Sequence, residues 1–164
     1  MNAIVVYESH WGNTAAVAAA IAEGIGPDAR ALTTSEATPA VVAEADLVVA
    51  GSPVMAFGLP SDRMFDALVK DPKAPTPPDV SHPSLRDWLA ALPTGHGVAA
   101  SFETKLWWSP GGATGAIDDR LRRAGFRTVA KGQKFVVKGS YGPLRDGEVE
   151  RARAWGAELA AALP

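Results

Sequence analysis

The chain contains no cysteine and only three histidines. Without cysteine there are no disulfides, no thiolate metal ligands and no thiol nucleophile, so disulfide scaffolds and cysteine-dependent enzymes are excluded. The histidines, His10, His82 and His96, lack the spacing of metal ligands. We therefore expect no metal site.

The chain also has little net charge and no long apolar run. The formal charge is −2, from 16 basic and 18 acidic residues, so no basic field is present that would gather nucleic acid. No run reaches the roughly 18 apolar residues of a membrane span, and no charged, cleavable leader precedes the first apolar run. We expect a cytoplasmic protein with neither a nucleic-acid partner nor a membrane partner.

What is present is an alternation of apolar runs and amphipathic stretches, in a chain of 164 residues that is 47% hydrophobic. This predicts one domain, 1–164, of the doubly wound α/β class, with a parallel sheet and right-handed crossovers. Five prolines between Asp71 and Pro83 predict a stiff surface excursion, 71–83, within that domain. The predicted strands are 3–7, 29–32, 46–53, 97–102 and a divided fifth strand at 126–130 and 134–137, and helices are predicted after 13, over 40–45, 62–69, 84–92 and 113–124, and after 146.

The most informative segment is the link between the first strand and the first helix, Ser9-His10-Trp11-Gly12-Asn13-Thr14. Its hydroxyls, its backbone N–H groups and the dipole of the following helix favour a bound phosphate. It is neither a Walker loop nor a dinucleotide fingerprint, and without Lys or Arg it suits a monophosphate better than a triphosphate. The alternative is a plain strand-to-helix turn capped by Asn13 or Thr14.

This segment resembles the phosphate loop of flavodoxins and related FMN proteins, in which a hydroxyl residue, two variable residues and Gly-Asn-Thr follow the first strand. Trp11 stands where many of them have another hydroxyl. Residues 51–54, 103–105 and 142–148 are similar to the family as well. The resemblance implies a flavodoxin-like fold: a single doubly wound five-stranded parallel sheet, strand order 2-1-3-4-5, with helices on both faces and noncovalent FMN.

In that strand order, ligands bind outside the carboxyl ends of the strands, between strands 1 and 3. Three loops leave this rim, at 9–14, 52–58 and 103–112, and they offer donors for a phosphate and aromatic faces for a flat ring. The resemblance places the phosphate on the first loop and the isoalloxazine ring between the other two, within 52–58 and 104–108. The expected cofactor residues are Ser9, His10, Trp11, Gly12, Asn13, Thr14, Ser52, Pro53, Val54, Met55, Ala56, Phe57, Gly58, Glu103, Thr104, Trp107 and Trp108.

Several of these residues have simpler interpretations. Trp107 and Trp108 are expected to divide their roles, one on the flavin and one packed on the following helix, or else to anchor the loop. Met55 and Phe57 suit core or loop packing, and Glu103 with Lys105 is interpreted as a solvated charge pair. The third loop also lacks the Tyr that often covers the outer ring face in the family, and the chain lacks the strong negative charge of electron-carrying flavodoxins.

The sequence thus predicts a flavin redox protein that passes electrons to a partner protein or a small acceptor. The cofactor supplies the chemistry, so no side chain is expected to be catalytic. One alternative is an FMN-dependent reductase of quinones or other small acceptors, and another is a binding module without flavin on the same fold. A phospho-acceptor receiver domain is disfavoured because Gly51-Ser52-Pro53 stands where its acidic residue is needed. The oligomeric state is not indicated.

Overall fold

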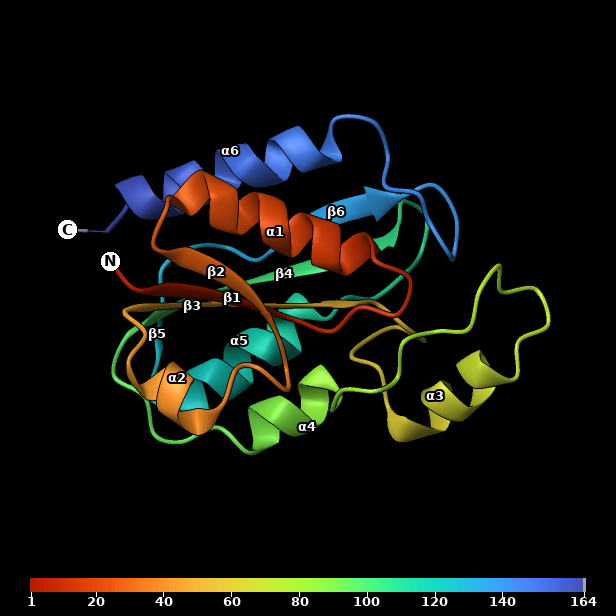
Figure 1. Cartoon of the computed structure of the whole chain (residues 1–164), viewed down its shortest axis with the longest axis horizontal. Helices are drawn as coiled ribbons and strands as arrows, with labels where there is room; N and C mark the ends of the chain where they lie inside the picture. Colours follow the sequence, from red (N-terminus) through yellow and green to blue (C-terminus); the bar gives the residue numbers. More distant parts are fainter. Residues whose placement is uncertain (164) are drawn as a thin grey trace.

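A computed structural model describes residues 1–163 as a three-layer α/β domain (Figure 1). The strands are β1 (Ala3–Tyr7), β2 (Ala29–Thr33), β3 (Leu47–Pro53), β4 (Val98–Leu106), β5 (Arg127–Thr128) and β6 (Gln133–Val137). The helices are α1 (Asn13–Ile25), α2 (Pro39–Ala43), α3 (Asp62–Val69), α4 (Leu85–Ala90), α5 (Thr114–Arg123) and α6 (Glu148–Ala161). No helix in this described part of the chain combines the length and the apolar character needed to cross a membrane.

The sheet is parallel and has the order β2-β1-β3-β4-β5, as predicted. The divided fifth strand is confirmed: β5 pairs with the start of β4 and β6 pairs with its end. One prediction was wrong, because β4 continues to Leu106 rather than ending at Phe102. Glu103 and Lys105 therefore lie within the sheet and not in the loop that follows it.

Both faces of the sheet are covered, which explains the unalternating apolar character of β1 and β3. In Figure 1, α1 and α6 lie on one face, while α2, α4 and α5 lie on the other. Side chains that alternate along β1 point to the two layers: Val5 joins the core under α1 and α6, and Ile4 and Val6 join the core over α4 and α5. The two cores hold the strand ends in fixed positions.

Helices α1 and α6 pack very closely through two glycines. A Cβ added at Gly24 would lie 1.9 Å from the carbonyl oxygen of Arg153, and one at Gly156 would lie 2.2 Å from the carbonyl oxygen of Ile21. Larger residues at these positions cannot be accommodated without separating the helices. This contact fixes the position of α1, whose amino terminus follows the loop 9–14.

The carboxyl ends of the parallel strands point to one edge of the molecule, on the right of Figure 1. At that edge lie the start of α1, helix α3 and the excursion 71–83. Chain ends are at the other edge: β1 begins there, and α6 runs toward it. The loops that follow β1, β3, β4 and β6 are thus brought together at one rim.

Candidate functional site

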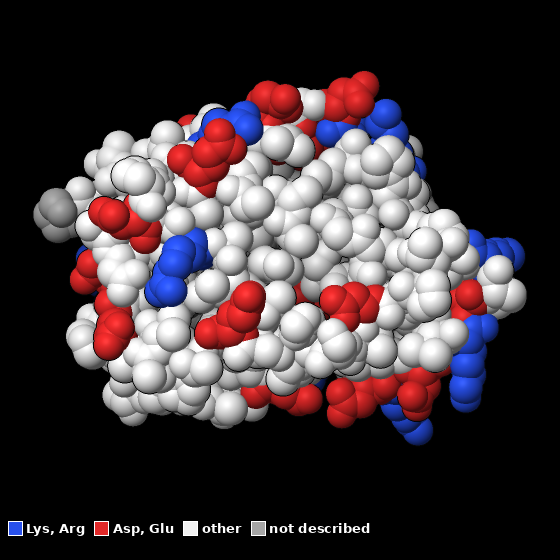
Figure 2. Space-filling model, in the orientation of Figure 1, with Lys and Arg blue, Asp and Glu red and all other residues white. Residues whose placement is uncertain are grey.

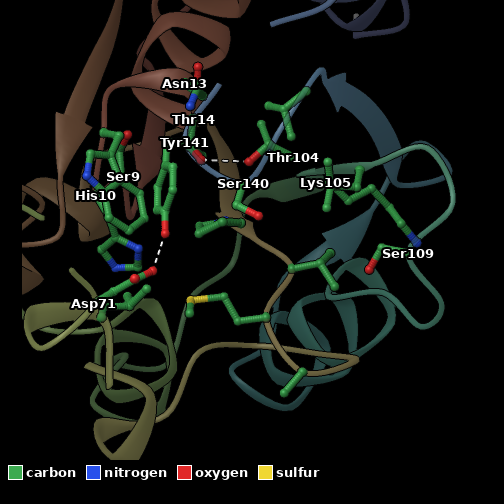
Figure 3. A pocket seen from close by; sticks show the side chains of 18 residues that line it. Ser9, His10, Asn13, Thr14, Asp71, Thr104, Lys105, Ser109, Ser140 and Tyr141 are labelled. Atoms are coloured by element: carbon green, nitrogen blue, oxygen red, sulfur yellow. Dashed lines mark hydrogen bonds between the residues drawn. The ribbon is translucent and has the colours of Figure 1, made fainter. Parts of the chain in front are cut away.

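A cavity of about 360 Å³ opens at this rim, within the size range of small-molecule and cofactor sites. Its walls come from the loops after β1, β3, β4 and β6, with additional residues from α3 and the excursion (Figure 3). The lining residues are Ser9, His10, Trp11, Asn13, Thr14, Pro53, Val54, Met55, Ala56, Leu68, Asp71, Thr104, Lys105, Leu106, Ser109, Val137, Ser140 and Tyr141.

One end of the cavity is formed by the amino terminus of α1. The N-cap is Gly12, not Asn13 or Thr14, and its positive φ of 94° turns the chain from strand to helix. The hydroxyl of Ser9 accepts a hydrogen bond from the N–H of Gly12 at 3.1 Å. Within residues 1–163, no acceptor pairs with the backbone N–H groups of Asn13, Thr14 and Ala15.

Two threonine hydroxyls lie at the same end. Thr14 and Thr104 are both buried, and their Oγ1 atoms are 2.8 Å apart. They come from α1 and β4, so a group bound next to this pair would contact both elements (Figure 3). Open space surrounds the position where Gly12 would carry a Cβ, with no heavy atom within 4 Å. Unpaired N–H groups, hydroxyls and free space at a helix amino terminus fit a phosphate monoester.

His10 is buried and contacts neighbouring parts of the chain. Its Nε2 lies 2.8 Å from a carboxylate oxygen of Glu8, and both side chains are buried. The imidazole also meets the ring of Phe65 edge-on, with 5.3 Å between centroids. Glu8 in turn accepts a hydrogen bond from the N–H of Leu85, at the start of α4. The loop therefore contacts α3 through the ring of His10 and α4 through the carboxylate of Glu8.

The excursion 71–83, which we call the strap, is largely exposed but is bound at two points to the loop 9–14. The indole Nε1 of Trp11 donates to the carbonyl of Thr76 at 3.0 Å. The N–H of Asp79 donates to the carbonyl of His10 at 2.9 Å. Trp11 thus uses its only side-chain donor on the strap and has none left for a phosphate.

Tyr141 connects the strap to the loop after β6. Its hydroxyl donates to the carboxylate of Asp71, and its ring meets Trp11 edge-on at 4.8 Å between centroids. Figure 3 shows Tyr141 and Asp71 together on one side of the cavity. The hydrogen bond from Tyr141 lowers the pKa of Asp71, and the Asp71 carboxylate raises the pKa of Tyr141.

We expect Tyr141→Phe to loosen the strap without unfolding the domain. The substitution keeps the aromatic contact with Trp11 and removes only the hydrogen bond to Asp71. Limited trypsin digestion should cut after Lys70 and Lys73 faster in the variant than in the wild type, because local opening exposes the backbone. Equal cleavage rates in the two proteins would show that the hydroxyl does not hold the strap.

The same contact predicts how strap closure depends on pH. The pKa of Asp71 is lowered in the folded protein. Its ionised form therefore stabilises the closed strap above the unfolded pKa, about 3.9, and this stabilisation is lost as the pH falls through the folded pKa. The pKa of Tyr141 is raised in the folded protein. Its protonated form therefore stabilises the closed strap below the unfolded pKa, about 10, and this stabilisation is lost as the pH rises through the folded pKa. Closure should therefore be constant near neutral pH.

The loop after β3 makes a tight turn beside the cavity. Met55 and Gly58 exchange two backbone hydrogen bonds, of 2.9 and 3.0 Å, and the intervening Ala56 and Phe57 have positive φ values of 42° and 76°. Positive φ is uncommon for residues other than glycine and is often found at functional sites. Met55 and Ala56 line the cavity, whereas the side chain of Phe57 is 68% exposed.

The two tryptophans after β4 lie outside the cavity lining. Trp107 is 70% exposed and Trp108 is 63% exposed, so neither is a buried anchor and neither packs into the α5 core. The expectation that one of them packs on that helix was wrong. Contact between one of them and a bound flavin stays a prediction.

Glu103 and Lys105 are buried, which corrects their interpretation as a solvated charge pair. Because the strand continues through both residues, they are enclosed by its neighbours β3 and β6. The carboxylate of Glu103 accepts hydrogen bonds from the N–H groups of Ala113 and Thr114, at 2.6 and 3.0 Å, and so caps the start of α5. The ammonium of Lys105 donates to the carbonyl of Gly111 at 2.5 Å.

The structure brings ten of the expected residues to the cavity and leaves seven outside its lining. The ten are Ser9, His10, Trp11, Asn13, Thr14, Pro53, Val54, Met55, Ala56 and Thr104. The seven are Gly12, Ser52, Phe57, Gly58, Glu103, Trp107 and Trp108. Gly12 nevertheless shapes the first loop, whereas Ser52 is fully buried and bonded to the carbonyl of Pro53.

Sequence reasoning missed the contribution of the loop after β6. Val137, Ser140 and Tyr141 line the cavity because β6 ends beside β4 at the same rim. Extending the carboxyl-end rule to the divided fifth strand would have indicated them. No feature of the sequence indicates that Leu68 and Asp71 line the cavity.

Comparison with solved structures identifies the same fold in known proteins. A flavodoxin from the domain Archaea matches with a TM-score of 0.69 and 21% identity, over 98% of this chain and 97% of that one. Flavodoxin 1 from Bacillus cereus matches with a TM-score of 0.68 and 18% identity, over 99% of both chains. A flavodiiron core from Synechocystis matches at 0.64 and 19% identity, and this chain covers 36% of it.

No protein-family model matches the sequence. No curated protein matches it either. The structural likenesses establish a flavodoxin-like fold over nearly the whole chain.

Proposed function

We propose that this protein binds FMN noncovalently in the rim cavity and acts as a flavin redox protein. The observation that carries the proposal is the combination, in one cavity, of unpaired N–H groups at the start of α1 with the paired hydroxyls of Thr14 and Thr104. The flavodoxin-like fold supports it, because the matches to solved flavodoxins cover nearly the whole chain.

The donors at the start of α1 would hold the phosphate. Ser9, Asn13 and Thr14 supply neutral donors there, and the dipole of α1 favours the negative charge. The walls formed by Pro53–Ala56 and Leu106 would hold the isoalloxazine ring and exclude water from it. When bound, FMN supplies the capacity to accept and release electrons, and the protein supplies position and electrostatics.

The first test is an absorption spectrum. Purified protein, or protein mixed with FMN and freed of the excess, should show the visible absorption bands of oxidised flavin. Protein that remains colourless after FMN is added and the excess removed would instead favour the alternative of a binding module without flavin.

We expect FMN to bind more tightly than FAD. The cavity offers one helix amino terminus and no Lys or Arg in the loop 9–14, which suits one monophosphate better than a pyrophosphate. The strap is also bound along this loop through Trp11 and His10, which restricts space beyond the phosphate. Parallel fluorescence titrations with FMN and FAD measure the difference, and equal or tighter FAD binding would contradict it.

Three exposed aromatic side chains, of Phe57, Trp107 and Trp108, are available for contact with a partner protein. Phe57 is joined to the loop after β4 by a hydrogen bond from the N–H of Gly112 to its carbonyl, so Phe57, Trp107 and Trp108 belong to adjoining loops at the rim.

Electron transfer to a partner protein remains the favoured activity, with reduction of a quinone or another small acceptor as the alternative. In Figure 2 the charged side chains on the visible face are scattered and of mixed sign, without one continuous basic or acidic patch. A cytoplasmic location is part of the same proposal.

A further inference from the structure

One stretch of the chain is strongly basic, although the protein as a whole is nearly neutral. Residues 120–138 contain seven basic residues and no acidic one, whereas the rest of the chain contains nine basic and 18 acidic residues. The seven are Arg120, Arg122, Arg123, Arg127, Lys131, Lys134 and Lys138. The small net charge thus hides a division between one basic stretch and a predominantly acidic remainder.

Four of these side chains are exposed and have no counter-ion. Arg122 lies 3.4 Å from a carboxylate oxygen of Asp119, and Lys138 lies 3.2 Å from one of Asp146. For the other four, no carboxylate oxygen in the described part of the chain, 1–163, lies within 4.0 Å of the charged group. We call these four the basic edge: Arg123, Arg127, Lys131 and Lys134.

The basic edge follows the last position of the sheet, opposite β2. Arg127 in β5 pairs with Val98, and Lys134 in β6 pairs with Glu103, five residues further along β4. At 3.3 Å per residue, the two cations are about 16 Å apart along the strand direction. Lys131 lies in the break between β5 and β6, and Arg123 is the last residue of α5, just before β5. The four charges therefore form one compact group.

Protection of a sheet edge does not explain this group. Lysines on edge strands do prevent pairing between molecules. The opposite edge, however, is formed by β2, whose only charged residue is Arg30. Like charges held together repel one another and destabilise the folded state, so the concentration at one edge requires another explanation.

The basic edge leads to the rim that carries the cavity. β6 ends at Val137, which lines the cavity together with Ser140 and Tyr141. Lys134 is three residues before Val137, about 10 Å along the strand. We propose that the basic edge is a docking surface for an acidic protein, which would lie beside the cavity wall formed by the loop after β6.

The surroundings of the edge favour a protein over a longer or wider anion. α5 packs on β5 and α6 packs on β6, and these helices carry exposed carboxylates at Asp119 and Glu150. A nucleic acid or an anionic bilayer presents negative charge well beyond 16 Å, a span of about five residues of strand, and would also meet these carboxylates. An acidic patch on a protein can match the basic edge alone, and the acidic remainder of the chain would orient its approach.

The test compares two variants that have the same net charge. The first replaces the four residues of the basic edge with glutamine. The matched control replaces four other exposed cations, in or next to β2, α3 and the strap, with glutamine: Arg30, Arg63, Lys70 and Lys73. The probe is a plant-type ferredoxin, a small acidic protein, and cytochrome c is the basic probe. Calorimetric titrations are run at about 10 and about 150 mM NaCl, where the Debye length is about 30 and about 8 Å.

We expect the wild type to bind ferredoxin at low salt and to lose at least about tenfold in affinity at the higher salt. The edge variant should lose at least about tenfold at low salt, and the control less than about threefold. Equal losses in the two variants overturn the inference, and so does a wild type that fails to bind ferredoxin or binds cytochrome c more tightly. Tighter binding of duplex DNA or phosphatidylserine vesicles than of ferredoxin also overturns it.

Two further measurements keep the result unambiguous. Melting curves check that the variants fold, and the pair Lys131→Gln with Lys134→Gln repeats the test with a smaller expected loss in a protein that keeps both arginines. Docking is measured on flavin-free protein, whereas a role of the partner in electron transfer rests on the proposed function. FMN binding without ferredoxin docking overturns this inference alone, and ferredoxin docking without FMN binding overturns the proposed function alone.

Discussion

Replacing Thr14 with valine is expected to weaken FMN binding about 10- to 100-fold. The substitution keeps the shape of the side chain and removes a hydroxyl that is 2% exposed and lies at the start of α1. A hydrogen bond to a charged acceptor contributes about 1.5–3 kcal/mol, and each factor of ten in affinity corresponds to about 1.4 kcal/mol. Fluorescence titration of the apoprotein with FMN measures the loss directly.

Riboflavin separates a phosphate contact from a general disturbance of the site. Because riboflavin lacks the phosphate, its affinity should fall much less than that of FMN in the same variant. Thr128→Val is the matched control, since Thr128 lies in β5 and does not line the cavity. If FMN and riboflavin lose affinity to the same extent, Thr14 does not bind the phosphate.

The second large effect concerns stability. Gly24→Val should lower the free energy of unfolding by about 3 kcal/mol, because even the first added carbon would lie 1.9 Å from the carbonyl oxygen of Arg153. At roughly 2–4 °C per kcal/mol for a domain of this size, the melting temperature should fall by about 6–12 °C. Urea denaturation of the flavin-free protein measures the free energy without a contribution from ligand binding.

Gly115→Ala provides the contrast for this prediction. Gly115 lies in α5, and a Cβ there would meet no heavy atom within 4 Å. Since alanine has the higher helix propensity and meets no neighbour here, this variant should be at least as stable as the wild type. If Gly24→Val were as stable as the wild type, the close approach of α1 and α6 would not be a determinant of the fold.

Much of the fold could be predicted because it depends on local patterns. The apolar runs at β1 and β3 indicated strands buried on both faces, and the break at Lys131-Gly132 indicated the division of the fifth strand. The end of β4 was misjudged because Glu103, Thr104 and Lys105 are polar, and polar residues ordinarily indicate a loop. Their burial depends on neighbours in β3 and β6 that the local sequence does not reveal.

The candidate site was predictable to a different extent at its two ends. The end of the cavity at the start of α1 is formed mainly by the consecutive residues 9–14, so this loop could be predicted from its composition, apart from the cap at Gly12. The contact between Asp71 and Tyr141 joins residues 70 positions apart, and no local periodicity indicates such a pair. The same holds for Lys105, whose burial and hydrogen bond to the carbonyl of Gly111 are visible only when its neighbours are placed in three dimensions.

The arrangement of the two edges of the sheet has a practical consequence. Met1 precedes the start of β1 and α6 ends at Ala161, both on the side away from the cavity. A surface linker attached at the amino terminus would therefore leave the rim facing outward. Immobilised in this way, the protein would present its cavity to the solution, so dissolved ligands could reach it without the support blocking their approach.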